Sequence, residues 1–123
     1  MIHHLNRVTA VRERLAALHN QGLALSVISL AELWEGILFS RDPRRGQQRL
    51  SEFLSGVDVL GVDEAICKRF GQLRGSLRSQ GKRIGDFDML IAATALEYDL
   101  TLLSNNRRHF EQIEGLRLES LVP

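Results

Sequence analysis

Two carboxylates stand at the start of an almost wholly apolar segment, where a charge needs compensation. Asp86 and Asp88 precede residues 89–96, which are apolar on nearly every side, so the helix expected there should be buried within the core. A carboxylate at the rim of a core requires hydrogen-bond donors, a positive partner or a bound cation. The alternative is that these residues only cap the helix and interact with the positive end of its dipole.

A third acid, Glu32, comes after the apolar run 23–28 and stands at the beginning of a helix expected over residues 30–39. Ser29 and Glu32 have the Ser-x-x-Glu spacing of a capping box, in which each side chain binds the other residue's backbone amide. Capping alone would account for this pair if no other feature pointed to a site.

Helical and strand patterns alternate along the 123 residues, of which 44% are hydrophobic and 25% charged. This composition suits one globular domain over residues 1–123. Strands that alternate with helices indicate an α/β fold with a mostly parallel sheet. The expected strands are 23–28, 57–62, 101–104 and one around 116–118, and the expected helices are 7–19, 30–39, one ending at Gly56, 64–79 after an Asp63 N-cap, 89–96, and a short one ending near Ile113.

Oxygen-bearing side chains come after two of the expected strands. Parallel sheets bind ligands outside the carboxyl ends of their strands, where Glu32, Ser104 and Asn106 are expected, and Asp88 can face the same edge. Carboxylates and carboxamides gathered without His or Cys suit Mg²⁺ or Mn²⁺ rather than zinc. Such a cation activates water and neutralises charge on a phosphodiester, so these residues favour metal-assisted phosphodiester hydrolysis.

Basic residues gather in three clusters, although the formal net charge is only +1. Such clusters could line a phosphate-binding groove, but arginine-rich helix faces are more often plain solvated surface. The clusters are Arg41, Arg44, Arg45 and Arg49; Arg74, Arg78, Lys82 and Arg83; and Arg107 with Arg108.

The apolar residues bear on compartment and assembly. No apolar run reaches membrane-spanning length and no secretory leader pattern is present, so a cytoplasmic protein without a membrane partner is expected. The single cysteine, Cys67, has helical spacing with Phe70 and is expected to be a core thiol. Trp34, Leu38 and Phe39 form either an apolar dimer patch or part of the core, and both alternatives stay open.

The order of three segments resembles a PIN domain of the VapC toxin type. These segments are Ser29-Leu30-Ala31-Glu32-Leu33 after a strand, Arg83-Ile84-Gly85-Asp86-Phe87-Asp88-Met89-Leu90-Ile91-Ala92-Ala93 opening a buried helix, and Leu103-Ser104-Asn105-Asn106-Arg107-Arg108-His109-Phe110 near the end. The resemblance implies a PIN-like three-layer α/β sandwich and a Mg²⁺-dependent (or Mn²⁺-dependent) endoribonuclease. It also implies the toxin of a toxin-antitoxin pair, which forms homodimers and is bound by a cognate VapB-type antitoxin.

The same resemblance implies roles for individual residues. Glu32 and Asp88 would be metal-ligating catalytic acids, Asp86 a neighbouring catalytic acid, and Asn106 the last polar residue of the catalytic site. The residues implied in contacts with an RNA substrate, such as tRNA or rRNA, are Ser104, Arg83 and Arg107.

The amino terminus departs from the family pattern. Proteins of this family open with a short apolar strand that ends in a triplet such as Asp-Thr-Asn, whose Asp is a metal ligand. The segment from Met1 to Asn6 resembles the residues just after that triplet, so the first strand and its acid are expected to be missing. Since metal affinity falls with each charge removed, impaired cleavage is expected. The alternative is a non-catalytic PIN remnant that binds antitoxin or RNA.

Overall fold

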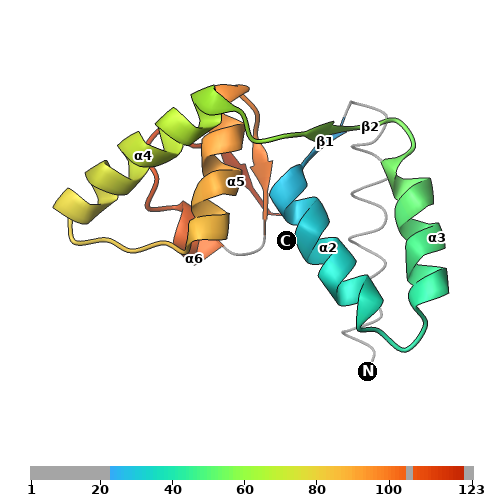
Figure 1. Cartoon of the computed structure of the whole chain (residues 1–123). Coiled ribbons are helices and arrows are strands. Elements are labelled where there is room, and N and C mark those ends of the chain that lie inside the picture. Colours follow the sequence, from blue (N-terminus) through green and yellow to red (C-terminus); the bar gives the residue numbers. More distant parts are fainter. Residues whose placement is uncertain (1–22, 105–106, 121–123) are drawn as a thin grey trace.

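Two pairs of parallel strands organise the chain, which a computed structural model describes over residues 23–104 and 107–120 (Figure 1). The strand β1 (Leu23–Ser26) pairs with β2 (Val57–Leu60), and β3 (Leu102–Leu103) pairs with β4 (Leu118–Glu119). The predicted α/β class with parallel strands is confirmed. Within the described residues the strands form two separate two-stranded sheets rather than one continuous sheet.

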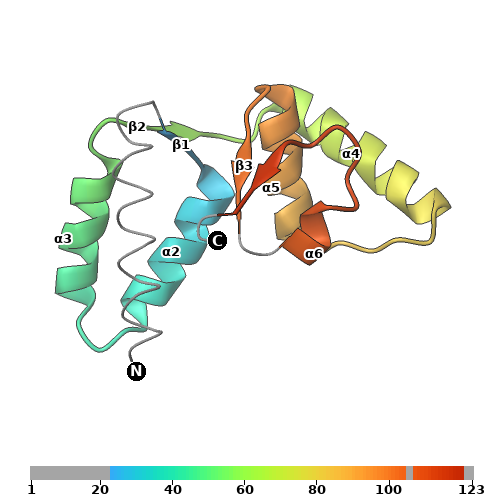
Figure 2. The same ribbon diagram turned by 180° about the vertical axis from the view of Figure 1, so that it is seen from behind.

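Helices supply the crossovers that parallel strands require. The helices are α2 (Val27–Leu38), α3 (Pro43–Leu54), α4 (Glu64–Ser79), α5 (Asp86–Glu97) and α6 (Arg107–Phe110). Figures 1 and 2 show two halves: α2 and α3 accompany β1 and β2, whereas α4, α5 and α6 accompany β3 and β4. The helix α2 also contacts α5, so it helps to join the two halves. None of the helices in the described ranges has the length and apolar character needed to cross a membrane.

Three sequence predictions concern residues outside this description. The helix expected over residues 7–19 and the departure expected at the amino terminus both fall within residues 1–22. Asn106 also lies outside the described residues.

The helix α2 begins earlier than predicted. Ser26 is its N-cap, and the Ser26 hydroxyl accepts a hydrogen bond from the backbone N–H of Ile28 at 3.1 Å. Val27 and Ile28 favour strands, but a serine placed directly before them satisfies the helix start. The strand prediction was therefore wrong for its last two residues, and Ser29 lies inside the helix rather than at a cap.

The helix α4 begins and ends as predicted. The Asp63 carboxylate accepts a hydrogen bond from the backbone N–H of Ile66 at 2.9 Å, which is the expected N-cap. Gly81 has φ of 71°, a left-handed conformation that suits glycine and stops the helix. The prediction for Cys67 was wrong, because this thiol is exposed. Ile66 is fully buried, so the next residue, Cys67, lies on a different side of the helix and points out of the core.

The core lies between α4 and α5. Met89, Ala92 and Ala93 have no exposed surface, which confirms the prediction that this helix is buried. Small alanine side chains let α4 approach closely, and among the described elements these two helices share the most extensive contact. The buried Thr94 hydroxyl is satisfied, since it donates to the Leu90 carbonyl at 2.8 Å. The core thus holds the start of α5, with Asp86 and Asp88, against its neighbours.

Candidate functional site

Asp86 and Asp88 occupy the first turn of α5 but do not cap it. Gly85 is the N-cap residue, and the helix start has no side-chain capping hydrogen bond. Both carboxylates still lie near the positive end of the helix dipole. Their side chains contact other elements instead, so the capping alternative does not explain why two acids stand here.

The carboxylate of Asp88 contacts an imidazole from α6. Oδ2 of Asp88 lies 2.9 Å from Nδ1 of His109. A carboxylate only accepts hydrogen bonds when ionised, so Nδ1 of His109 carries the proton in this contact. The Asp88 side chain is 27% exposed and the His109 side chain is 47% exposed. The pair therefore lies at the protein surface, and the carboxylate is the more buried of the two groups.

His109 is a site residue that sequence reasoning missed. The sequence places it directly after the basic pair Arg107 and Arg108, where it looked like part of a solvated cluster. The available signal was its position three residues after Asn106, within the same motif. Nothing in the local pattern indicated that α6 would bring this ring to the first turn of α5.

The carboxylate of Asp86 is used differently. It forms an ion pair with Arg74 of α4, whose guanidinium carbon also lies 5.3 Å from the centre of the Phe70 ring. Asp86 is 77% exposed, and its partner fastens the start of α5 to the middle of α4. This arrangement marks Asp86 as a residue that positions the helix start.

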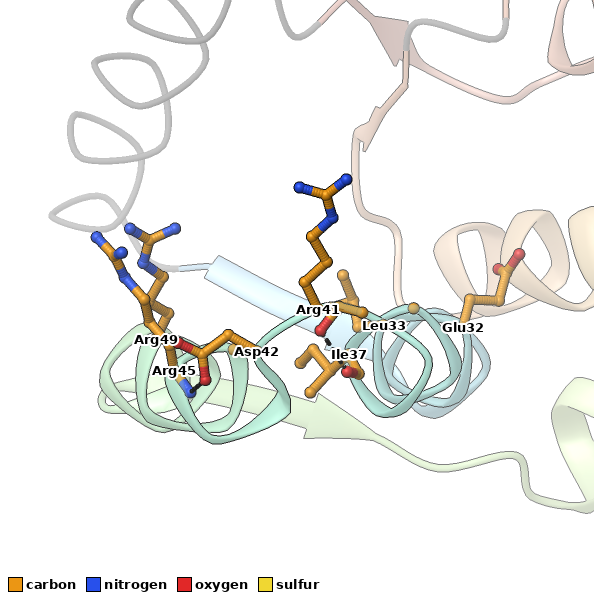
Figure 3. A pocket seen from close by; sticks show the side chains of 10 residues that line it. Glu32, Leu33, Ile37, Arg41, Asp42, Arg45 and Arg49 are labelled. Carbon is orange, nitrogen blue, oxygen red and sulfur yellow. Dashed lines mark hydrogen bonds between the residues drawn. The ribbon is translucent and has the colours of Figure 1, made fainter.

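Glu32 lies in the second turn of α2 and lines a groove of about 520 Å³ between α2 and α3 (Figure 3). The predicted capping box is wrong, because Ser26 caps this helix and Glu32 lies within it. In Figure 3 the Glu32 carboxylate extends from the side of α2 that faces α5. Among the described residues it has no hydrogen-bond or ion-pair partner, so its oxygens are available to a ligand.

The other predicted site residues lie on three different elements. Ser104 comes directly after β3, where its backbone N–H donates to the Glu119 carbonyl at 3.0 Å. Arg107 on α6 is held by Glu111 at 3.1 Å and by the Ser120 hydroxyl at 3.2 Å. Arg83 is exposed in the loop before α5. The structure therefore brings Asp88 and His109 together, while Arg107 is already engaged by its own neighbours.

Likeness to known proteins decides the family to which this geometry belongs. Residues 2–116 match the family model described as the PIN domain. The chain belongs to the PIN domain family. It is 39% identical over 115 residues to the tRNA(fMet)-specific endonuclease VapC of Shigella flexneri, with 93% of this chain and 86% of that protein covered. It is 38% identical over 100 residues to the ribonuclease VapC of Haemophilus influenzae, with 81% of this chain and 76% of that protein covered.

Solved structures agree with this assignment. The crystal structure of DNA-bound VapBC from Salmonella typhimurium matches this PIN domain with a TM-score of 0.82 at 34% identity, over 91% of this chain and 84% of that chain. The VapBC-1 structure from nontypeable Haemophilus influenzae matches with a TM-score of 0.79 at 28% identity, over 89% and 85%. The resemblance to VapC-type PIN domains that the three sequence segments indicated is confirmed.

PIN-domain nucleases generally use divalent metal ions. The described residues contain no group of three His, Cys, Asp or Glu side chains arranged to hold a metal. Glu32 and Asp88 nevertheless fit a hard cation, because Mg²⁺ is commonly held by one or two carboxylates and keeps several waters. Oδ1 of Asp88 has no hydrogen-bond partner among the described side chains, so one of its oxygens remains available.

Proposed function

We propose that this PIN domain is the toxin of a VapBC-type toxin-antitoxin pair and that it cleaves RNA as a divalent-metal-dependent endoribonuclease. The observation that carries the proposal is the state of the two acids Glu32 and Asp88. Glu32 has no partner in the described part of the chain, and Asp88 is hydrogen-bonded on one oxygen only. Glu32 is exposed and Asp88 is partly buried, and each has a carboxylate oxygen that can ligate a cation.

The roles of the residues are assigned from their chemistry and from the family pattern. Glu32 and Asp88 would hold Mg²⁺ or Mn²⁺, which when bound activates a water and neutralises charge on the phosphodiester. His109 orients the Asp88 carboxylate by donating to Oδ2. Asp86 positions the start of α5 through Arg74 and adds negative charge beside the site. We assign Asn106 to the last polar position of the site on the family pattern.

RNA contacts are assigned by charge and position. Arg83 in the loop before α5 and Ser104 after β3 are proposed to contact the substrate. Arg107 is retained as a further RNA contact, although Glu111 and Ser120 already hold its guanidinium. The Shigella relative is named as a tRNA(fMet)-specific endonuclease, so tRNA is the first RNA to test.

A VapB-type antitoxin is the proposed protein partner, since the matched structures from Salmonella typhimurium and Haemophilus influenzae are VapBC complexes. We also propose a homodimer that works in the cytoplasm, where its RNA substrate and antitoxin are made. Trp34, Leu38 and Phe39 are 38%, 54% and 88% exposed, so the alternative that they belong to the core is wrong. This apolar patch on α2 and its C-cap is the proposed dimer contact.

The test is cleavage of end-labelled tRNA by the purified chain with Mg²⁺, Mn²⁺ or EDTA. We expect weak cleavage with either metal, none with EDTA, and loss of the remaining cleavage in Asp88→Asn and Glu32→Gln with unchanged circular dichroism melting. Arg44→Gln, at an exposed position of α3 outside the groove, is the matched control and should cleave normally. RNA binding without any cleavage would indicate a non-catalytic binding module instead. Cleavage that survives both substitutions would contradict the assignment of the acids.

A further inference from the structure

Three arginines stand along the groove between α2 and α3. Arg41 lies in the turn after α2, and Arg45 and Arg49 lie four residues apart on α3, which is about one helical turn. All three line the groove, and Figure 3 shows their side chains extending to the same side of the two helices. Leu33 and Ile37 of α2 also line the groove.

None of these three guanidinium groups is neutralised within the described residues. Four other arginines have carboxylate partners there, in the pairs Arg69–Glu97, Arg74–Asp86, Arg107–Glu111 and Arg117–Asp99. Arg41, Arg45 and Arg49 have no ion pair and no side-chain hydrogen bond in the same part of the chain. The one acid between them in sequence, Asp42, accepts a hydrogen bond from the Arg45 backbone N–H at 3.2 Å and caps α3.

Close packing of α2 against α3 fixes the spacing of the two helices that form the groove. A Cβ atom added at Gly46 would lie 3.1 Å from both Cγ atoms of Ile37, so α2 and α3 touch at this point. Arginines on a rigid helix pair keep their spacing, which favours a ligand whose negative charge repeats at a regular interval. A single-stranded nucleic acid has such a backbone, whereas acidic side chains on a peptide need not repeat.

The groove also reaches the proposed catalytic acid. Glu32 lines its wall on α2, but Figure 3 shows the Glu32 carboxylate on the side away from Arg45 and Arg49. A strand whose phosphate lies at Glu32 would continue past Leu33 and Ile37 toward the arginines. Charge and spacing therefore identify the same occupant.

We propose that the groove between α2 and α3 is the track for the RNA strand flanking the cleaved bond, with Arg41, Arg45 and Arg49 binding successive phosphates. This inference rests on the proposed ribonuclease function and specifies how the substrate is held. The contacts are to the backbone, so the track adds affinity and register without selecting a base sequence.

The test measures binding separately from cleavage. A fluorescent single-stranded oligoribonucleotide is titrated with the purified chain in EDTA, and its anisotropy is followed at several salt concentrations. The logarithm of affinity falls linearly with the logarithm of salt concentration, and for single strands each lost phosphate contact makes this negative slope less steep by about 0.7. We expect Arg45→Gln and Arg49→Gln each to make the slope less steep by about this amount, for every oligonucleotide sequence tested.

Arg44→Gln is the matched control, because Arg44 neighbours Arg45 on α3, is exposed, and does not line the groove. It should leave the slope unchanged. An equal loss in Arg44→Gln would show that only overall surface charge matters and would overturn the track. Unchanged RNA slopes together with weakened antitoxin binding in Arg45→Gln and Arg49→Gln would assign the groove to the antitoxin, which also overturns it.

The assay distinguishes this inference from the proposed function. Binding in EDTA does not depend on cleavage, so arginine-dependent slopes in a chain that never cleaves RNA would support the track while refuting the ribonuclease assignment. Metal-dependent cleavage with slopes that do not respond to Arg45→Gln or Arg49→Gln would support the ribonuclease assignment and overturn the track.

Discussion

Oδ2 of Asp88 and Nδ1 of His109 lie 2.9 Å apart, and this contact joins the first turn of α5 to α6. The donor fixes one oxygen of the carboxylate and leaves the other for a ligand. Hydrogen bonds of this kind to ligating carboxylates orient the carboxylate and strengthen metal binding. The pair therefore predicts a measurable role for a residue that is not itself an acid.

We predict that His109→Leu weakens Mn²⁺ binding about tenfold, the lower end of the range for such outer partners. His109→Asn should retain most of the affinity, because its amide can donate from near the position of Nδ1. Isothermal titration with Mn²⁺ measures both variants, and thermal melting shows whether each is folded. Equal Mn²⁺ affinity in His109→Leu and the parent chain would remove His109 from the site.

Asp86 and Asp88 should respond differently to the same substitution. Asp86 pairs with Arg74, so Asp86→Asn should lower the free energy of unfolding by about 0.5 kcal/mol, a modest value because the pair is exposed. Adding Arg74→Gln to Asp86→Asn should lower the free energy of unfolding little further. A double-mutant cycle by urea denaturation measures the coupling between the two residues. Asp88→Asn should abolish cleavage, whereas Asp86→Asn should retain part of it. Equal losses of cleavage would give Asp86 a direct catalytic role.

The close approach of α2 and α3 predicts opposite outcomes for two glycines inside helices. Gly36 has open space around an added Cβ, so Gly36→Ala should stabilise the chain by about 0.5–1 kcal/mol through helix propensity. Gly46→Ala would place its Cβ 3.1 Å from Ile37, so that gain should be lost or reversed. Urea denaturation of both variants decides the matter. An equal gain at both positions would show that the helices separate easily.

Met89, fully buried next to Asp88, should dominate the stability of the start of α5. We predict that Met89→Ala lowers the free energy of unfolding by about 2–5 kcal/mol, because a large side chain leaves a cavity. Met89→Leu preserves volume and should cost less than about 1.5 kcal/mol. Denaturation curves compare the two substitutions. A small effect of Met89→Ala would mean that α4 and α5 close the space by moving together.

The exposed patch of Trp34, Leu38 and Phe39 predicts the oligomeric state. Phe39→Asp would place a charge at the most exposed member of the patch, so it should convert a dimer to a monomer. Light scattering coupled to size exclusion measures the mass of the parent and the variant over a range of concentrations. Phe87→Asp, at another exposed phenylalanine, is the control and should leave the mass unchanged. A parent chain that is monomeric throughout would end the dimer proposal.

Local signals predicted the helices well. The Asp63 cap, the stop at Gly81 and the buried helix through Met89 each depend on residues close together in sequence, and the structure confirms them. The start of α2 was misplaced because strand-favouring residues come directly after a capable cap at Ser26. In that case, the local hydrogen bond outweighed the strand propensity.

Features that depend on distant residues were harder to predict. The contact between Asp88 and His109 spans 21 positions, and no periodicity indicates it. The pairing of Asp86 with Arg74 likewise depends on how α4 packs on α5. The division of the strands into two pairs is a property of the tertiary arrangement. Patterns along a chain predict elements, whereas partners depend on how those elements dock.

The separation of the two strand pairs has a consequence for control of the site. Glu32 belongs to the half that contains β1, and Asp88 belongs to the half that contains β3. No strand ladder of the described residues joins these halves, and α2 meets α5 through helix packing. Sliding at a helix interface is easier than breaking a ladder. A protein that binds both halves could therefore shift Glu32 relative to Asp88 without contacting either carboxylate.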